Sequence, residues 1–178
     1  VILLAGITES LRQQTQERID EGIVGYTTKK IGKVTKNGTV GVGLDNLPMR
    51  ATSFTSCVSD FTANSDKIAT TLGTHKSLVL FVIKKNVSVL QKLYNWLKDH
   101  NMDQVKGYVD EPMLLIDDEA DNASVNTKND ETDPTKTNKL IRQICNLFKN
   151  SSYVGFTATP FANVFIDPDS VDSMKHAD

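Results

Sequence analysis

The chain has 178 residues, of which 39% are hydrophobic and 24% are charged, and its formal net charge is −2. These values fit one globular domain with a core of ordinary size and exclude a chain that is disordered by composition. The small net charge gives no general attraction to nucleic acid or to an anionic membrane, so any such contact needs a local basic cluster.

Two further features narrow the class of protein. No apolar stretch approaches the roughly 20 residues that a membrane span needs, and no charged and then apolar leader precedes the first strand. Cys57 and Cys145 stand in no metal-ligand or C-x-x-C spacing, so neither a disulfide framework nor a zinc site is expected. We therefore expect a cytoplasmic protein without membrane association.

The beginning of the chain predicts a strand, a helix and a β-rich insertion. Residues 1–5 are apolar and predict a strand, and Thr8 can cap a helix that runs to about residue 21, with Gly22 as its stop. The expected core-facing positions of that helix are Leu11, Thr15 and Ile19. Residues 23–73 are rich in Thr, Ser and Gly, and Asn37-Gly38 predicts a hairpin turn there.

The rest of the chain alternates strands and helices. Strands are expected at Leu78–Ile83, Met113–Ile116 and Tyr153–Thr157. Asn86 can cap a helix whose core-facing stripe is Val89, Leu93, Trp96 and Leu97. Residues 122–138 are polar and without periodicity, so a loop is expected there, and a second amphipathic helix carries Leu140, Ile141, Ile144, Cys145 and Phe148. Such units predict an α/β domain with a mostly parallel sheet that is covered on both faces.

Adjacent carboxylates end the strand at Met113–Ile116, in the run Asp117-Asp118-Glu119-Ala120-Asp121. A buried parallel strand delivers such acids to the carboxyl edge of the sheet, where ligands of open α/β sheets bind. One acid can hold Mg²⁺ through water while its neighbour accepts the proton of an attacking water, as nucleotide hydrolysis requires. The alternative is a solvated acidic turn.

A second run, Tyr153-Val154-Gly155-Phe156-Thr157-Ala158-Thr159-Pro160, predicts a neighbouring strand that ends in hydroxyl groups. The phosphate-binding sequence G-x-x-x-x-G-K-[ST] is absent, because the only Gly-Lys pair is followed by Val34. The chain also begins in mid-strand without an initiator methionine. We therefore expect a fragment of a longer protein whose P-loop lies upstream.

These strings bear a family resemblance. Residues 118–121 (DEAD) and 157–159 (TAT) resemble two motifs of superfamily-two helicases, and residues 8–14 carry their T-x-x-L-x-x-Q spacing. The longer strings IDDEADNASVNT, YVGFTATPFANVFI and LRQQTQERID resemble the Z-one domain, a family of proposed endonucleases associated with helicase-type ATPases. The resemblance implies a three-layer, RecA-like P-loop ATPase domain over residues 1–178, interrupted by the 23–73 insertion.

The resemblance also implies roles for single residues. Asp118 would hold Mg²⁺ through water, and Glu119 would orient or deprotonate the water that attacks the γ-phosphate of ATP. Asp121 would bond a hydroxyl of Thr157 or Thr159 and so connect hydrolysis to movement of a second RecA-like domain.

Contacts with a nucleic-acid backbone would come from Thr8, Arg12 and Gln14, helped by the amide groups of the helix start. Lys84 and Lys85 follow a strand at the same edge, and the sequence leaves open whether they bind nucleic acid or are simply solvated.

The leading hypothesis is a DNA-directed, helicase-like ATPase that couples ATP hydrolysis to translocation on DNA or to DNA remodelling or processing. Two alternatives stay open. One is a nuclease component whose cutting residues lie elsewhere, and the other is a non-catalytic scaffold gated by nucleotide. The fragment alone is expected to be inactive as an enzyme.

Overall fold

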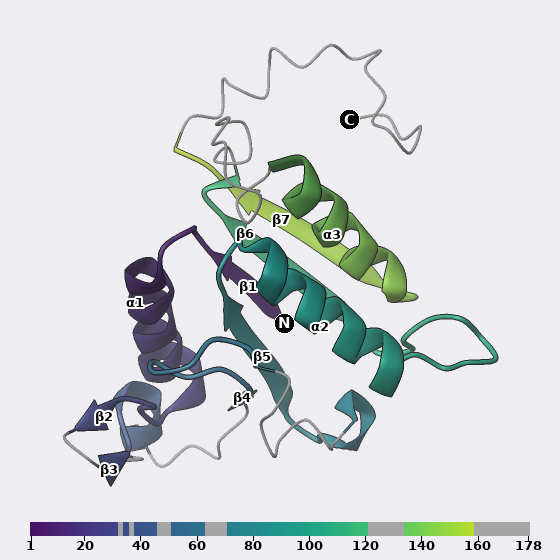
Figure 1. The fold of residues 1–178 in the computed structure, drawn as a ribbon. Helices are drawn as coiled ribbons and strands as arrows, with labels where there is room; N and C mark the ends of the chain where they lie inside the picture. Colours follow the sequence, from purple (N-terminus) through teal and green to yellow (C-terminus); the bar gives the residue numbers. More distant parts are fainter. Residues whose placement is uncertain (32–33, 36–37, 46–50, 63–70, 121–133, 159–178) are drawn as a thin grey trace.

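The chain forms an α/β fold around a parallel sheet, and the structure, a computed structural model, describes residues 1–31, 34–35, 38–45, 51–62, 71–120 and 134–158 (Figure 1). The helices are α1 (Glu9–Ile19), α2 (Val87–His100) and α3 (Pro134–Leu147). A π-helical turn, Asp20–Val24, extends α1. The strands are β1 (Ile2–Ala5), β2 (Lys30–Ile31), β3 (Val34–Thr35), β4 (Ala51–Ser53), β5 (Leu78–Ile83), β6 (Met113–Asp118) and β7 (Ser151–Phe156). Short 3-10 turns lie at Gly41–Asp45 and Leu72–Thr74.

Five strands form one sheet in the order β4-β5-β1-β6-β7, and all neighbouring strands are parallel. This confirms the expected α/β class and parallel sheet. After β1 the chain moves through α1 towards the β4 side, and after β6 it moves through α3 to β7 on the opposite side. The direction of the connections therefore reverses between the adjacent strands β1 and β6. Such a reversal marks the crevice where open α/β sheets bind ligands, at the carboxyl ends of the strands.

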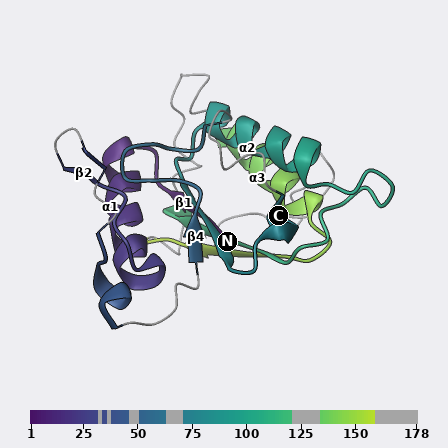
Figure 2. The ribbon, with the colours of Figure 1, turned by 90° about the horizontal axis from the view of Figure 1, so that it is seen from below.

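The larger core lies under α2 and α3, which lie side by side on one face of the sheet (Figures 1 and 2). Asn86 caps α2 as expected, because its side chain accepts the N–H groups of Ser88 and Val89. The buried positions of α2 are Leu90, Leu93, Trp96 and Leu97. Three of these four were expected, and Leu90 takes the place given to Val89, which is only half-buried.

The face of α1 that meets the sheet is polar, which corrects the expected stripe of Leu11, Thr15 and Ile19. Leu11 is exposed, whereas Arg12, Gln16 and Asp20, the next positions at helical spacing, are buried. Arg12 is buried against backbone carbonyl groups. Its guanidinium donates hydrogen bonds to the carbonyls of Val82 and Cys57 at 3.5 and 3.4 Å.

Gln16 and Asp20 form the centre of a buried hydrogen-bond network. The Gln16 amide donates to Asp20 Oδ1 at 2.8 Å and accepts the Thr55 hydroxyl at 2.7 Å. Asp20 Oδ2 accepts both the N–H and the hydroxyl of Thr28, at 2.8 and 2.7 Å. Because each polar group has a partner, this face can be buried without the penalty of an unpaired donor or acceptor. The buried positions of α1 therefore recur with helical spacing, but they are occupied by polar side chains.

The predicted stop at Gly22 is wrong, because the helical path continues as the π-turn to Val24 and ends at Gly25. Gly25 has φ +84°, and a Cβ at this residue would come within 2.9 Å of Gly43 Cα. Both constraints favour glycine at position 25, whereas nothing lies within 4 Å of a Cβ at Gly22.

The segment 23–73 is only partly an insertion. It contains β4, which pairs with β5 at one edge of the main sheet, and the separate antiparallel pair β2 and β3. Ile31 pairs with Val34, so the antiparallel pairing closes up before the expected Asn37-Gly38 turn is reached, and residues 32–33 and 36–37 lie outside the described residues. Gly38 instead lies along a paired arm, where its carbonyl accepts the N–H of Thr27. Asn37 itself lies outside the described residues.

Among the described residues, the sheet is packed unevenly on the face that carries α1. On the face of α1, the smaller core centres on Val24, Ala51 and Leu80, and so lies over the β1, β5 and β4 side. All six residues of β7 are exposed, and Phe156 is 57% exposed. The expected loop at 122–138 also needs correction at its end, because α3 already begins at Pro134; residues 121–133 lie outside the described part. No helix among the described residues has the length and apolar character needed to cross a bilayer.

Candidate functional site

The loops that follow β1 and β6 meet at the crevice between these two strands. Ala5 pairs with Asp118, and Asp118 pairs with Phe156 of β7, so the carboxyl ends of β1, β6 and β7 lie at the same level. The residues that come next are Gly6 after β1, Glu119 after β6 and Thr157 after β7. The topology alone therefore gathers the predicted acids and hydroxyl at one edge of the sheet.

Glu119 occupies a tight turn at this edge. Its φ is +59°, the left-handed conformation that L-residues with a side chain rarely adopt. Its carboxylate lies against the loop after β1, because a Cβ at Gly6 would come within 3.2 Å of Glu119 Oε2. On the other side, a Cβ at Gly155 of β7 would come within 3.1 Å of Ala120 Cβ. Two glycines thus give the acid-bearing turn the space it occupies.

A buried ion pair lies directly beneath this turn. Lys85 Nζ is 2.5 Å from Asp117 Oδ1 and 2.6 Å from the carbonyl oxygen of Glu119, to which it donates a hydrogen bond. The contact with Asp117 Oδ1 is an ion pair without the geometry of a directed hydrogen bond. Tyr153 donates its hydroxyl to Asp117 Oδ2 at 2.9 Å. Burial, and then the negative charge of Asp117, raises the pKa of the Tyr153 phenol above its ordinary value.

No role separate from its neighbours was predicted for Asp117, although the alternation of side chains along a strand distinguishes it from Asp118. Met113, Leu115 and Asp117 lie two residues apart on β6, and all three are buried on the face that meets α2 and α3. Asp118 has the opposite parity and is exposed. The two adjacent aspartates therefore differ in environment: Asp117 belongs to the interior, and Asp118 is exposed at the carboxyl end of β6.

The donor chemistry at the crevice fits a magnesium ion held through water. Mg²⁺ prefers carboxylate oxygens and keeps several waters, so one exposed carboxylate with a second beside it is a suitable set. Asp118 and Glu119 supply these two groups. Within the described residues no cluster of three or more His, Cys, Asp or Glu side chains forms a closed metal cage.

The expected hydroxyl partner lies where the register predicts, and two other expected residues cannot be placed. Thr157 follows β7 directly and is half-buried. Asp121 and Thr159 lie outside the described residues. The predicted bond between Asp121 and a threonine hydroxyl therefore stays a prediction.

The residues predicted to contact nucleic acid separate into two groups. Thr8 caps α1 and is exposed, and Gln14 is exposed on the same helix. Lys84 is half-buried and pairs with Glu9 at 3.0 Å. Arg12 is 0% exposed and Lys85 is 5% exposed, so neither presents its cationic group to a phosphate on the surface.

The structure therefore corrects the expectations for Arg12 and Lys85, because both cations have partners inside the fold. Arg12 Nη2 is 2.7 Å from Glu9 Oε1, and Lys85 is paired with Asp117. A buried cation needs a paired anion or carbonyl to offset the loss of hydration. Nucleic-acid contact stays a prediction for Thr8, Gln14 and Lys84.

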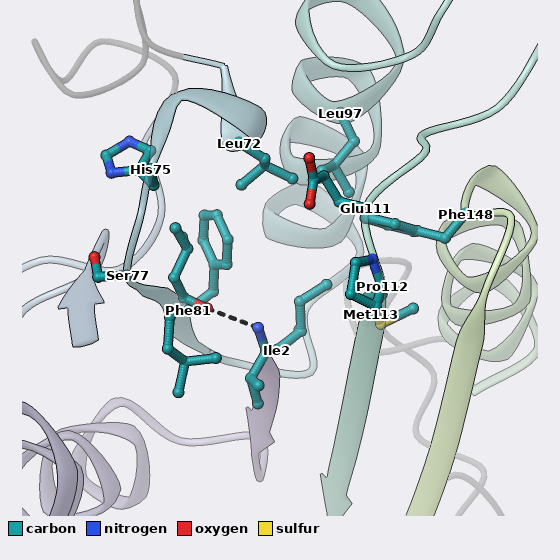
Figure 3. A pocket seen from close by; sticks show the side chains of 13 residues that line it. Ile2, Leu72, His75, Ser77, Phe81, Leu97, Glu111, Pro112, Met113 and Phe148 are labelled. Carbon is teal, nitrogen blue, oxygen red and sulfur yellow. Dashed lines mark hydrogen bonds between the residues drawn. The ribbon is translucent and has the colours of Figure 1, made fainter. Parts of the chain in front are cut away.

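A cavity of about 190 Å³ lies at the opposite edge of the sheet, at the amino ends of β1, β5 and β6 (Figure 3). Its lining is largely apolar, with His75 and Glu111 among the side chains around it. Because ligand chemistry in open α/β sheets belongs to the carboxyl ends of the strands, this cavity takes no part in the site at Glu119.

Comparisons of the chain with known protein families, with curated proteins and with solved structures find no match. The arguments on function therefore rest on the residues and on their arrangement at the crevice between β1 and β6.

Proposed function

We propose that this chain is the acid-bearing part of a RecA-like ATPase domain of the helicase type, related to the Z-one domain, that acts on DNA. The observation that carries the proposal is the position of Glu119, at the reversal of the sheet topology between β1 and β6 and beside the exposed carboxylate of Asp118. The resemblance of residues 118–121 and 157–159 to helicase motifs points to the same chemistry.

In this proposal the two acids have different tasks. Asp118, at the exposed end of β6, holds the hydration shell of Mg²⁺. Glu119 accepts a proton from the attacking water, which requires a carboxylate fixed in direction. The bound Mg²⁺ supplies charge neutralisation on the phosphate oxygens of ATP. Thr157, after β7, would donate the hydrogen bond to Asp121 that connects hydrolysis to movement of a second RecA-like domain.

The remaining parts of such an enzyme must come from outside residues 1–178. The sequence lacks a G-x-x-x-x-G-K-[ST] loop, so the backbone cradle for the β- and γ-phosphates has to be supplied by another segment. The arginine that stabilises the transferred phosphoryl group is expected from a second motor domain. Residues 1–178 alone should bind ATP weakly.

A steady-state ATPase assay of the complete protein that contains this chain, with and without DNA, tests the proposal. Turnover that DNA stimulates supports a motor or remodelling enzyme. Tight nucleotide binding with negligible turnover indicates instead a nucleotide-gated scaffold. Magnesium-dependent cleavage of DNA without ATP turnover indicates a nuclease. Either of the last two results contradicts the proposal.

A further inference from the structure

Lys85 connects three loops at the carboxyl edge of the sheet. Its backbone N–H donates to the carbonyl of Gly6, in the loop after β1, at 2.9 Å. Its Nζ contacts the side chain of Asp117 on β6 and the carbonyl of Glu119 in the turn that follows. Lys85 itself follows β5. One buried residue therefore connects the ends of β5, β1 and β6.

The bond to Glu119 is the contact that a purely structural ion pair would not need. Lys85 and Asp117 could neutralise each other without a third partner, but Nζ also donates to the carbonyl of the residue with the left-handed backbone. A side chain at φ +59° is held only if its surroundings determine that conformation. The hydrogen bond fixes the peptide group after Glu119, and so fixes the direction in which the Glu119 side chain leaves the turn.

A second contact, from Tyr153, holds the side chain of Asp117 in place. Tyr153 of β7 donates to Asp117 Oδ2, so Asp117 is held from the sheet side while its Oδ1 faces Lys85. Asp117 in turn keeps the ammonium group of Lys85 at the position from which it reaches the Glu119 carbonyl. The order of contacts is thus Tyr153, Asp117, Lys85 and the Glu119 turn.

We propose that Lys85 is a positioning residue, which holds the turn that bears Glu119 in the geometry needed for proton transfer. This inference rests on the proposed ATPase function for its catalytic consequence. Its structural part, the control of the Glu119 turn, does not depend on that function. In this proposal the buried Lys85 acts through its hydrogen bond to the backbone of Glu119.

The test uses four variants of the complete protein. Lys85→Met removes the ammonium group. Lys85→Met/Asp117→Asn also removes the negative charge that would otherwise be buried without a partner, so it keeps the test valid if the single variant fails to fold. Tyr153→Phe removes the hydrogen bond that holds Asp117 from β7 but leaves Lys85 in place, so it tests the far end of the same chain of contacts. Lys106→Met removes an exposed ion pair with Asp110 on the loop after α2.

For the double variant we expect kcat for ATP to fall roughly 10²-fold, the scale of a misplaced catalytic group, while KM changes much less. Lys106→Met is the matched control and should keep kcat within about threefold of the unmodified protein, well below the effect of a lost catalytic group. Tyr153→Phe should lower kcat less than the double variant does, because Lys85 keeps its bond to the Glu119 carbonyl. A double variant that folds and recovers normal kcat would overturn the proposal, because Lys85 would then serve only to neutralise Asp117.

Amide hydrogen exchange supplies a readout that needs no ATPase activity. The amide of Ala120 should exchange faster in the double variant than in Lys106→Met, since the Glu119 carbonyl has lost its donor. Unchanged exchange at Ala120 overturns the positioning role whatever the ATPase result. If the unmodified protein shows no turnover, the proposed function fails, and faster exchange at Ala120 still supports the hold of Lys85 on the turn.

Discussion

Gly6 leaves the space that the carboxylate of Glu119 occupies at the crevice between β1 and β6, although the two residues are far apart in sequence. A Cβ on Gly6 would lie 3.2 Å from Glu119 Oε2 and 3.1 Å from Leu11 Cδ1. Gly6 also has φ +64°, so both its backbone and its surroundings favour glycine. The first strand therefore contributes to the candidate site by leaving space, and the acid from β6 occupies it.

Gly6→Ala should lower both stability and turnover. The left-handed backbone costs an alanine about 1 kcal/mol or more, and the new methyl group displaces the carboxylate of Glu119 or the side chain of Leu11. We expect a lower midpoint in urea denaturation and a loss of kcat in the complete protein. Gly22→Ala is the control, because nothing lies within 4 Å of a Cβ at that residue. Equal effects of the two changes would show that the contact with Glu119 has no consequence.

How far the sequence predicts this fold depends on which physical signal each element carries. Apolar periodicity and a capping residue predicted α2, and continuous apolar runs predicted β5 and β6, because these elements face the main core. The same signal failed for α1, where Arg12, Gln16 and Asp20 are buried by mutual hydrogen bonds. Such burial depends on partners distant in sequence, such as Thr55, which periodicity cannot reveal.

The sequence predicted the acidic residues of the candidate site but not the buried residues that hold them in position. Strand topology explains why residues after β6 and β7 lie together, so Glu119 and Thr157 could be expected at one edge. The inward role of Asp117 follows from its parity with Leu115, yet its pairing with Lys85 requires knowledge that β1 lies between β5 and β6. For the same reason, two adjacent lysines gave no sign that only Lys85 would be buried.

Glu119→Gln preserves the shape of the side chain but removes the proton acceptor. In the complete protein we expect ATP turnover to fall by roughly 10²-fold or more, while ATP binding is kept, given the usual size of general-base effects. Turnover by phosphate release and nucleotide binding by calorimetry measure the two quantities separately. Unchanged turnover would rule out Glu119 as the base.

Asp118→Asn should act on the metal rather than on proton transfer. Removing the charge from the exposed end of β6 weakens the hold on hydrated Mg²⁺. Added magnesium should therefore tighten nucleotide binding in the unmodified protein and have a much smaller effect in the variant. Binding titrations at several magnesium concentrations check this. A full magnesium response in the variant would place the metal elsewhere.

Asp20→Ala should destabilise the fold strongly without a direct effect on the crevice. The change leaves the N–H and hydroxyl of Thr28 and the amide of Gln16 without the acceptor they share. Losing a buried charged acceptor of this kind costs about 3–5 kcal/mol. Glu21→Ala, at the next and exposed position, is the matched control and should change stability by less than about 0.5 kcal/mol. Urea denaturation compares them, and similar losses would contradict a specific role for Asp20.

Glu9 should make stability depend on pH. Burial raises the pKa of its carboxyl group, but hydrogen bonds from Arg12 and Lys84 lower it further, and the net shift from the ordinary value of 4.5 is downward. A lowered pKa in the folded state means that the ion pairs stabilise the fold above the unfolded value, and that this contribution is lost as pH falls through the folded value. Acidification should therefore remove it.

Glu9→Gln should thus be less stable than the unmodified protein at neutral pH and equal to it well below pH 4.5. Because the Glu9 side chain is 41% exposed, solvent screening limits the difference at neutral pH to about 1 kcal/mol. Glu17→Gln, which breaks the more exposed pair with Lys29, should show a smaller difference. Urea denaturation at both pH values measures these gaps, and a gap for Glu9→Gln that persists in acid would mean that its charge is not the stabilising feature.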